Sequence, residues 1–503
     1  MVFLCRMHQR RRIGIIGGGI AGLAAAVRLR IAGFDVLVFE AAPTAGGKLG
    51  AMQLGPFRFD TGPSLFTRPD LIDELFELAG ENPRDHFSYQ RLDPVCHYFY
   101  ADGKCFHAPA EPAALAATME KELGEPAANI LAMQNRGSYL YRITAPVFLE
   151  SSLHTLLTYI RPSGLRGIAN LPFIGTMRSM NKENIGRFAT AHARQFYNRF
   201  ATYNGSDPYR APATLNVIPH LESAMGAWYP EGGMRCIPMA VYELALRLGV
   251  RFRFNAKVER ILLDAGKKKV RGLLLEGGEE VPTDIVLSNA DVFPTYKKML
   301  PDLKAPARVE QVDSSSSALI FYWGIRKSFS QLGVHNIFFS SDYEQEFRDI
   351  WNEQQAPEDP TIYINITSKC DPADAPEGME NWFVMVNVPA NRGQDWDAIR
   401  RQLRETVIRR MSRELGTDIA AWIAEEEFLD PVRIEARTGS YRGALYGSSS
   451  NRMLAAFFRQ ANFSSKVKGL YFAGGSVHPG GGIPLCLLGA RITASLIQKK
   501  YQP

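Results

Sequence analysis

A glycine-rich stretch near the amino terminus constrains the fold more than any other feature. It lies in RRRIGIIGGGIAGLAAAVRL, between a short apolar run and a longer run rich in alanine and leucine. Gly17, Gly19 and Gly22 give the pattern G-x-G-x-x-G, and a second apolar run, DVLVFE, ends at Glu40. The order of strand, glycine turn, helix, strand and acidic residue is typical of the βαβ unit that binds a dinucleotide.

Each part of this unit has a physical role. Gly17 permits the tight turn, Gly19 lets the backbone approach a pyrophosphate, and Gly22 lets the helix pack closely on the strand. The pyrophosphate is expected at the helix N-terminus, where unpaired N–H groups and the helix dipole favour an anion. Glu40 is suited to accept hydrogen bonds from ribose hydroxyls and would repel a 2′-phosphate.

The same stretch has arginines followed by apolar and small residues, as an export signal has. Its five glycines make a poor signal helix, so we favour the buried strand, turn and helix. No uncharged apolar run reaches the roughly 18 residues of a membrane span, so no spanning helix is expected.

The residues after Glu40 distinguish between two dinucleotide cofactors. Gly46, Gly47 and Lys48 follow the acid directly, whereas nicotinamide-binding folds usually turn straight into a helix here. A segment of this kind beside the cofactor phosphates is typical of flavoproteins of the glutathione-reductase type, and the Lys48 ammonium would offset phosphate charge. We therefore predict FAD; the alternative is a surface turn with an exposed lysine.

Two further segments are predicted to approach the cofactor. The turn FDTGP carries Thr61 and Gly62, and Asp60 or Thr61 is a candidate to cap a helix over residues 69–80. In folds of this type the backbone near Val258 flanks the adenine.

A second glycine-rich turn lies near the carboxyl end, in GLYFAGGSVHPGGGIPL. It again reads as strand, loop and helix, so its N–H groups can face the negative charge at N1 and O2 of a reduced flavin. The candidate cofactor residues in this turn are Gly474, Gly475, His478, Gly482, Ile483 and Pro484.

The chain of 503 residues is too long for one ordinary core, so two domains are expected. We predict an α/β protein: a glutathione-reductase-type FAD-binding Rossmann domain with an inserted α+β substrate domain. The cofactor domain is assigned residues 10–75, 229–300 and 429–503, and the substrate domain residues 76–228 and 301–428. Within the latter we expect strands at 318–325, 335–341, 362–368 and 382–389, and a helix at 396–415.

Residues 139–177 form an apolar and aromatic segment with scattered arginines. The segment is too interrupted to span a bilayer. It can lie in the membrane interface, or it can be a helical cap whose apolar face is core. Both interpretations stay open at this point.

Charge and cysteine content limit the partners. The net charge of +6 suits an anionic cofactor or membrane surface, although a mildly basic balance is more often only a solvated surface. No basic stripe with interleaved aromatics is present, so no nucleic-acid partner is expected. None of the six cysteines forms a C-x-x-C pair, which indicates reduced thiols in a cytoplasmic protein and no metal site.

Seven motifs together carry a resemblance: IGIIGGGIAGLAAA, GGKLG, FDTGPSLFT, WYPEGGM, VLSNADV, GALYGSSSN and AGGSVHPGGGIPL. Nearly end to end, the chain resembles the carotenoid desaturase family, phytoene desaturase-like flavoproteins related to the amine oxidases. Its closing motif is similar to that of the 1-hydroxycarotenoid 3,4-desaturases, also called methoxyneurosporene-type dehydrogenases. Gly489 departs from the family, where serine is common.

The resemblance implies an oxidoreductase of carotenoid biosynthesis. It would transfer a hydride from an allylic C–H of an acyclic, 1-hydroxylated carotenoid to flavin N5 and introduce a C3–C4 double bond. The implied partners are a long apolar polyene, a peripheral membrane surface, and oxygen or a quinone as electron acceptor. The expected location is cytoplasmic, peripherally membrane-associated. His335 and Glu222, with His220 beside the latter, are candidates for the proton acceptor, and a structural role is the alternative for each.

Other functions within and beyond this family stay open. A phytoene desaturase, or an isomerase or saturase acting on a polyene, would share the same motifs. A non-catalytic prenyl-lipid carrier of the Rab-escort type would share the fold. Such carriers tend to lose flavin-side features, whereas this chain keeps both Glu40 and the HPGGGIP loop.

Overall fold

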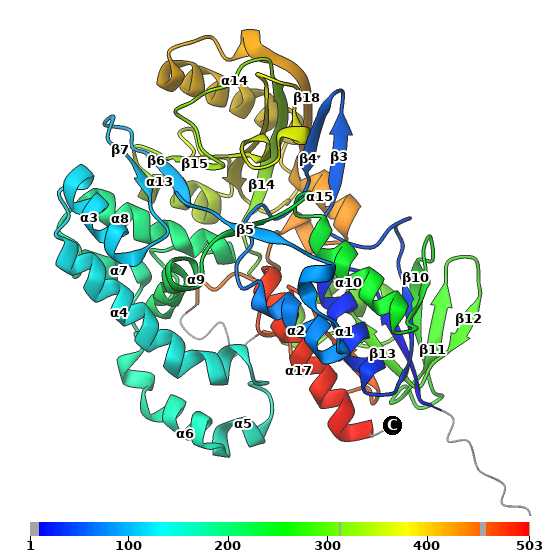
Figure 1. The fold of residues 1–503 in the computed structure, drawn as a ribbon. Helices are drawn as coiled ribbons and strands as arrows, with labels where there is room; N and C mark the ends of the chain where they lie inside the picture. The colour runs from blue at the N-terminus through cyan, green and yellow to red at the C-terminus, as the bar shows by residue number, and fades with distance from the viewer. Residues whose placement is uncertain (1–9, 311–312, 453–458, 502–503) are drawn as a thin grey trace, which may run out of the picture.

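A computed structural model describes residues 10–310, 313–452 and 459–501 of the chain (Figure 1). Its first large element is a parallel sheet of five strands in the order β19-β13-β1-β2-β9. Segments from three distant parts of the sequence therefore meet in one sheet. The strands are β1 (Arg12–Ile16), β2 (Asp35–Phe39), β9 (Arg251–Arg253), β13 (Ile285–Ser288) and β19 (Leu470–Phe472).

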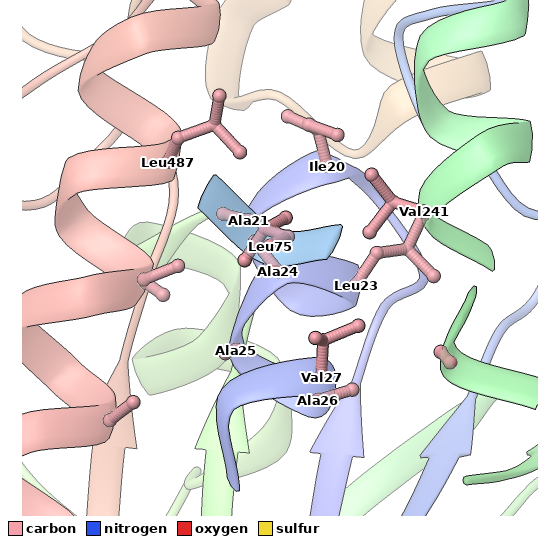
Figure 2. Close-up of a cluster of buried hydrophobic side chains, with 14 of the residues drawn as sticks. Ile20, Ala21, Leu23, Ala24, Ala25, Ala26, Val27, Leu75, Val241 and Leu487 are labelled. Atoms are coloured by element: carbon pink, nitrogen blue, oxygen red, sulfur yellow. The ribbon is translucent and has the colours of Figure 1, made fainter. Parts of the chain in front are cut away.

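Helices cover one face of this sheet. Helix α1 (Ile20–Ile31) lies at the centre and packs against α17 (Ile483–Tyr501), α10 (Cys236–Arg247) and α2 (Asp70–Ala79), as Figure 2 shows. Four alanines of α1 are almost fully buried, and their small side chains let the neighbouring helices approach closely. The alanines are Ala21, Ala24, Ala25 and Ala26.

A small antiparallel sheet covers the other face. It consists of β10 (Val258–Leu263), β11 (Val270–Leu275) and β12 (Glu280–Pro282). Side chains alternate along β1, so Ile13 and Ile15 join the helical core while Ile16 joins the core beneath the small sheet. Burial on both faces explains why the parallel strands read as continuous apolar runs.

The second large element is a seven-stranded mixed sheet in the order β18-β14-β17-β16-β15-β6-β7. One face packs on the long helix α14 (Trp396–Leu415). The other face carries the hairpin of β3 (Ala51–Leu54) and β4 (Phe57–Asp60), whose Phe57 and Phe59 pack on β14. The seven strands are β6 (Cys96–Phe99), β7 (Cys105–Ala108), β14 (Ser317–Ile325), β15 (His335–Phe338), β16 (Ile362–Ile366), β17 (Glu380–Val388) and β18 (Ile423–Leu429).

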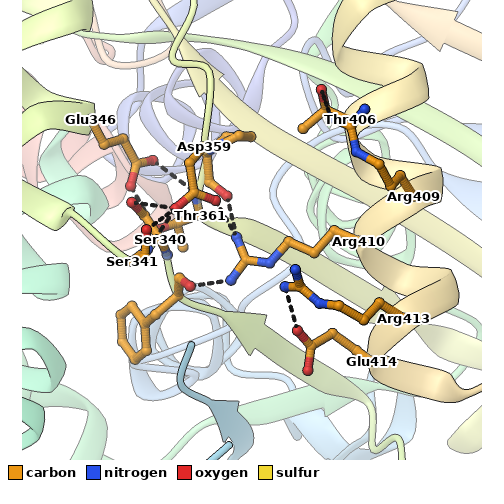
Figure 3. Close-up of polar contacts among 12 residues, drawn as sticks. Ser340, Ser341, Glu346, Asp359, Thr361, Thr406, Arg409, Arg410, Arg413 and Glu414 are labelled. Atoms are coloured by element: carbon orange, nitrogen blue, oxygen red, sulfur yellow. Dashed lines mark hydrogen bonds and ion pairs between the residues drawn. The ribbon is translucent and has the colours of Figure 1, made fainter. Parts of the chain in front are cut away.

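A buried polar network fastens α14 to the loops at the ends of these strands (Figure 3). The Arg410 guanidinium donates to Asp359 at 3.0 Å, to the Pro360 carbonyl at 2.9 Å and to the Phe339 carbonyl. Beside it, Glu346 accepts a 2.6 Å hydrogen bond from the Thr361 hydroxyl. Burial raises the pKa of Glu346 to about 7.

A helical region forms the flank of the molecule next to β6 and β7 (Figure 1). Residues 139–177 belong to it. Among the described residues, no helix is long and apolar enough to cross a membrane. Its helices are α3 (Pro112–Leu123), α4 (Ala127–Thr144), α5 (Leu156–Ile160), α6 (Pro162–Ala169), α7 (Met180–Ile185), α8 (Ala191–Asn198) and α9 (Ile218–Met225).

The sequence predicted most of these elements. Helix α14 has the predicted bounds, and the four predicted strands of the substrate domain are β14, β15, β16 and β17. The predicted cap of α2 is wrong, because Pro69 precedes this helix and Asp60 instead accepts a hydrogen bond from the Met234 amide at 3.0 Å. The α/β fold class is confirmed. The domain boundaries stay a proposal.

Candidate flavin and substrate site

A cavity of about 1390 Å³ lies between the parallel sheet and the seven-stranded sheet. It exceeds the roughly 300–1,000 Å³ of a pocket for one small ligand. It brings together segments near residues 17, 48, 61, 258 and 474. The predicted cofactor residues that line it are Gly17, Gly19, Glu40, Gly46, Gly47, Lys48, Thr61, Gly62, Val258, Gly474, Gly475, Gly482, Ile483 and Pro484.

The first glycine loop is shaped to receive an anion. Gly17 has a φ of 95°, and Gly19 precedes α1 without any side chain capping the first turn of the helix. The free N–H groups of that turn are a general anion-binding site. Gly22 does not line the cavity; a Cβ atom there would lie 2.2 Å from the Gly17 carbonyl oxygen, so glycine is required for the turn to close on the helix.

The Glu40 carboxylate is held rigidly at the end of β2. One oxygen accepts a 2.6 Å hydrogen bond from the Gly18 amide, and the other a 2.8 Å hydrogen bond from the Ala42 amide. Each carboxylate oxygen keeps a further lone pair for a ligand hydroxyl. The second glycine segment lies against the first, since the Gly46 amide donates to the Gly18 carbonyl at 3.0 Å.

Asn289, which the sequence analysis did not single out, joins the two glycine-rich turns. It follows β13, and its amide donates to the Ala473 carbonyl at 3.0 Å. A Cβ atom at Gly19 would lie 2.9 Å from its Oδ1, and one at Gly474 would lie 2.7 Å from its Nδ2. The one signal that pointed to it was the motif VLSNADV.

Lys48 contacts the carboxyl-terminal segment. Its ammonium donates to the Leu445 carbonyl at 2.9 Å, and burial lowers its pKa while the nearby Asp291 carboxylate opposes this. Burial raises the pKa of Asp291, which caps its own turn by accepting from the Phe293 amide at 2.9 Å. The predicted phosphate role of Lys48 stays a prediction.

His478 lies behind the cofactor loop and does not line the cavity. Its Nε2 donates to the Ser151 carbonyl at 2.8 Å, and the ring packs edge-on against His154. Burial lowers the pKa of His478 to about 3. Its contacts therefore fasten the loop to the helical region.

The two candidate proton acceptors line the part of the cavity beneath the seven-stranded sheet. Glu222 accepts from the Arg199 guanidinium at 3.1 Å and from the Tyr203 hydroxyl at 2.5 Å. Burial lowers the pKa of His335 to about 3, far below the value near 7 that suits a general base. Proton transfer by either residue stays a prediction.

These features fit a flavin dinucleotide. The cavity has an uncapped helix N-terminus at one glycine loop, an oriented carboxylate at hydrogen-bonding reach of that loop, and a second glycine loop at the start of α17. At Gly482, which has a φ of 103°, a Cβ atom would meet nothing within 4 Å, so the backbone borders open space.

The comparisons agree with this geometry. Residues 20–498 match the model of the family described as flavin containing amine oxidoreductase. The chain is 48% identical over 483 residues, 96% of its length and 98% of the relative, to a 1-hydroxycarotenoid 3,4-desaturase of Flavobacterium sp.. It is 34% identical to a zeta-carotene-forming phytoene desaturase of Myxococcus xanthus, covering 96% and 93% of the two chains. The structure of cyclohexylamine oxidase from Brevibacterium oxydans is similar over 98% of this chain and 100% of that one, with a TM-score of 0.61 at 16% identity.

The chain therefore belongs to the flavin-containing amine oxidoreductase family, and the predicted FAD cofactor is confirmed. Within that family it belongs with the carotenoid desaturases. It is an FAD-dependent oxidoreductase acting on CH–CH bonds, and a carotenoid polyene is its substrate class.

Replacing Glu40 by glutamine should weaken FAD binding about tenfold to a hundredfold, because hydrogen bonds to a charged group contribute about 1.5–3 kcal/mol. The measurement is a titration of apoprotein with FAD, followed by quenching of flavin fluorescence. Glu279→Gln, at an exposed carboxylate paired with Arg253, is the matched control and should bind as the wild type does. Equal affinity in the Glu40→Gln variant would contradict the assignment.

Replacing His478 by glutamine should reduce the loss of stability at acid pH. The folded pKa of about 3 lies below the usual value of about 6.5, so the unfolded chain takes up a proton first as the pH falls. This protonation lowers the free energy of unfolding by about 2 kcal/mol between pH 7 and pH 5. Urea denaturation at pH 5, 7 and 8 measures the free energy of unfolding of the variant and the wild type, with pH 8 as the reference. If this free energy falls equally in both proteins as the pH is lowered, His478 is not buried in its neutral form.

Proposed function

We propose that this protein is a 1-hydroxycarotenoid 3,4-desaturase of carotenoid biosynthesis. The observation that carries the proposal is one cavity that is lined both by the glycine loops and by many apolar side chains, which we call the apolar wall. The similarity to the Flavobacterium enzyme supports the position of the new double bond. Apolar residues of that wall include Leu215, Ile218, Leu221, Ile320, Phe383 and Met385.

The chain would position the substrate and exclude water. Desaturation removes a hydride and a proton from adjacent carbons, and FAD, when bound, supplies the hydride acceptor. Loss of an allylic hydride leaves a positive charge that the conjugated polyene itself delocalises, so the protein need not provide a nucleophile. The apolar wall holds the reacting carbons in a dry, fixed orientation. The proton leaves to Glu222 or water, and the two electrons pass on to oxygen or a quinone.

The helical region offers a surface for membrane docking. Helices α5 and α6 with the loop after them present large apolar side chains to solvent, with Leu156 86% and Met177 82% exposed. Arg161 and Arg166 stand among these side chains, which is the composition of an interfacial helix. We call this surface the apolar face; its residues are Leu156, Leu157, Ile160, Leu165, Ile168, Phe173 and Met177.

Residues of the apolar face are close in sequence to residues that line the cavity. Phe148 and Leu149 precede α5, Ile174 and Thr176 follow α6, and all four line the cavity. A polyene dissolved in the bilayer would then enter without crossing water. This arrangement supports a peripheral membrane location.

The function is tested by supplying two polyenes to the FAD-loaded enzyme in lipid vesicles under air or with a quinone. A 1-hydroxylated acyclic carotenoid should gain one conjugated double bond, visible as a red shift of its absorbance, and phytoene should not react. Conversion of phytoene alone would favour a phytoene desaturase, and a blue shift would favour a saturase. A change in isomer without a change in mass would favour an isomerase, and binding without turnover a carrier.

Replacing Leu156 and Leu157 together by glutamate should reduce binding to vesicles of phosphatidylcholine and phosphatidylglycerol at least tenfold. Burying one leucine side chain contributes about 1.5–3 kcal/mol, and a carboxylate cannot enter the acyl region without a large cost. Sedimentation with vesicles measures the partition. Leu246→Glu, at an exposed leucine of α10, is the control and should partition as the wild type does. Unchanged partition of the double variant would exclude this face.

A further inference from the structure

A buried polar cluster interrupts the apolar wall of the cavity. Its side chains come from three places in the fold: the 3₁₀ turn Arg199–Asn204 after α8, helix α9, and the strands β15 and β16. Each lines the cavity, and Arg199 and His335 are only 3% exposed. We call this set the polar cluster; its members are Arg199, Tyr203, Glu222, His335 and Tyr363.

The hydrogen bonds of the cluster fix the tautomer of His335. The Asn365 amide nitrogen donates to the Val334 carbonyl at 3.0 Å, which orients that side chain, and also lies 3.2 Å from Nδ1 of His335. Nδ1 must therefore accept, and the neutral ring carries its proton on Nε2. The Tyr363 hydroxyl lies 2.8 Å from Nδ1 and is a second donor to this nitrogen.

The resulting Nε2–H has no acceptor. Nε2 is buried without a hydrogen-bond partner among the described residues, in a ring that lines the cavity. An unmet donor of this kind is costly, and buried polar groups are almost always paired in folded proteins. The unpaired Nε2–H of His335 therefore indicates that a ligand supplies its acceptor.

Arg199 supplies a second unmet donor. Its terminal nitrogens donate to Tyr203 at 2.8 Å and to Glu222 at 3.1 Å, so its charge is balanced. Its Nε, however, is buried without a partner in the described chain. The Tyr203 hydroxyl is already satisfied, since it accepts from Arg199 and donates to Glu222. The cluster thus offers two free donors, and its remaining acceptors are further lone pairs of Glu222 and of the Tyr363 oxygen.

We propose that the polar cluster is a subsite for the terminal hydroxyl of the polyene, with the His335 Nε2–H as the donor to its oxygen. The proposal rests on the proposed function and names the part of the site that selects its substrate. A hydrocarbon end leaves the donor unpaired, whereas a hydroxyl oxygen has two lone pairs to accept it. A site built around such a group rejects an analogue that lacks it.

The position of the cluster suits this chemistry. Tyr363 hydrogen-bonds the Ser64 hydroxyl at 2.6 Å, and Ser64 follows the turn of Thr61 and Gly62 that lines the cofactor end of the cavity. In a 1-hydroxylated chain the hydroxyl-bearing carbon is separated from C3 by a single carbon. A hydroxyl subsite must therefore adjoin the place where the C3–C4 bond reacts.

The test compares binding and turnover of two acyclic carotenoids that differ only in the hydroxyl at C1. Binding is measured by quenching of tryptophan fluorescence, and turnover by absorbance, with FAD-loaded wild type and the variants His335→Phe and His335→Gln. Loss of the donor in His335→Phe should weaken binding of the hydroxylated carotenoid about tenfold, raise its KM similarly and leave binding of the hydrocarbon unchanged. His335→Gln, which places an amide donor near Nε2, should restore most of the affinity. Met385→Leu, on the apolar wall, should alter both affinities by the same factor.

Each outcome decides the proposal. Equal losses for the two carotenoids in His335→Phe would overturn it and would mean that the ring only packs against both polyenes. A wild type that converts both polyenes with equal KM would overturn the subsite while leaving the desaturase function intact. A wild type that binds FAD and converts neither polyene would overturn the proposed function itself. Melting curves that match the wild type would confirm that the variants fold.

Discussion

The parallel pairing of β13 between β1 and β19 is the constraint on which the site depends. Carboxyl ends of parallel strands share one edge of the sheet, and the chain that leaves them there is available to ligands. The loop after β1 leads into α1, and the loop after β19 leads into α17. Two helix N-termini are thus brought to one cavity from opposite ends of the sequence. Asn289, at the end of the strand between them, contacts both loops and fixes their spacing.

Much of this architecture could be predicted from sequence because its determinants are local. A positive φ at Gly17, a close approach at Gly22 and an acid at the end of β2 each require a particular residue type, so the pattern can be recognised without knowledge of tertiary contacts. The long amphipathic helix α14 and the apolar strands of the second sheet likewise have one plausible periodicity. The predicted cap of α2 was wrong because Asp60 pairs instead with its neighbour Arg58 and with the distant Met234 amide.

The substrate side could not be predicted in the same way. Arg199 and Tyr363 lie far apart in the sequence, and nothing at either position marks it as part of a site. Their roles follow from which hydrogen bonds are made and which are missing, and that accounting needs coordinates. His335 was singled out as a candidate base on residue type alone. Its surroundings give it the properties of a neutral donor instead, because burial disfavours the imidazolium and Nδ1 is occupied.

Segments that line the apolar cavity continue directly into the helices of the apolar face. The contact between His478 and the Ser151 carbonyl is relevant here, because it links the loop before α17 to the chain just ahead of α5. Ser151 also donates to the Pro146 carbonyl at 2.8 Å, which holds the turn that separates Leu149 of the cavity from Leu156 of the apolar face. Displacing the apolar face would therefore pull on a buried hydrogen bond at the base of the cofactor loop. The apolar face and the flavin cradle are in this way parts of one continuous structure, joined by a neutral imidazole whose protonation would lower stability.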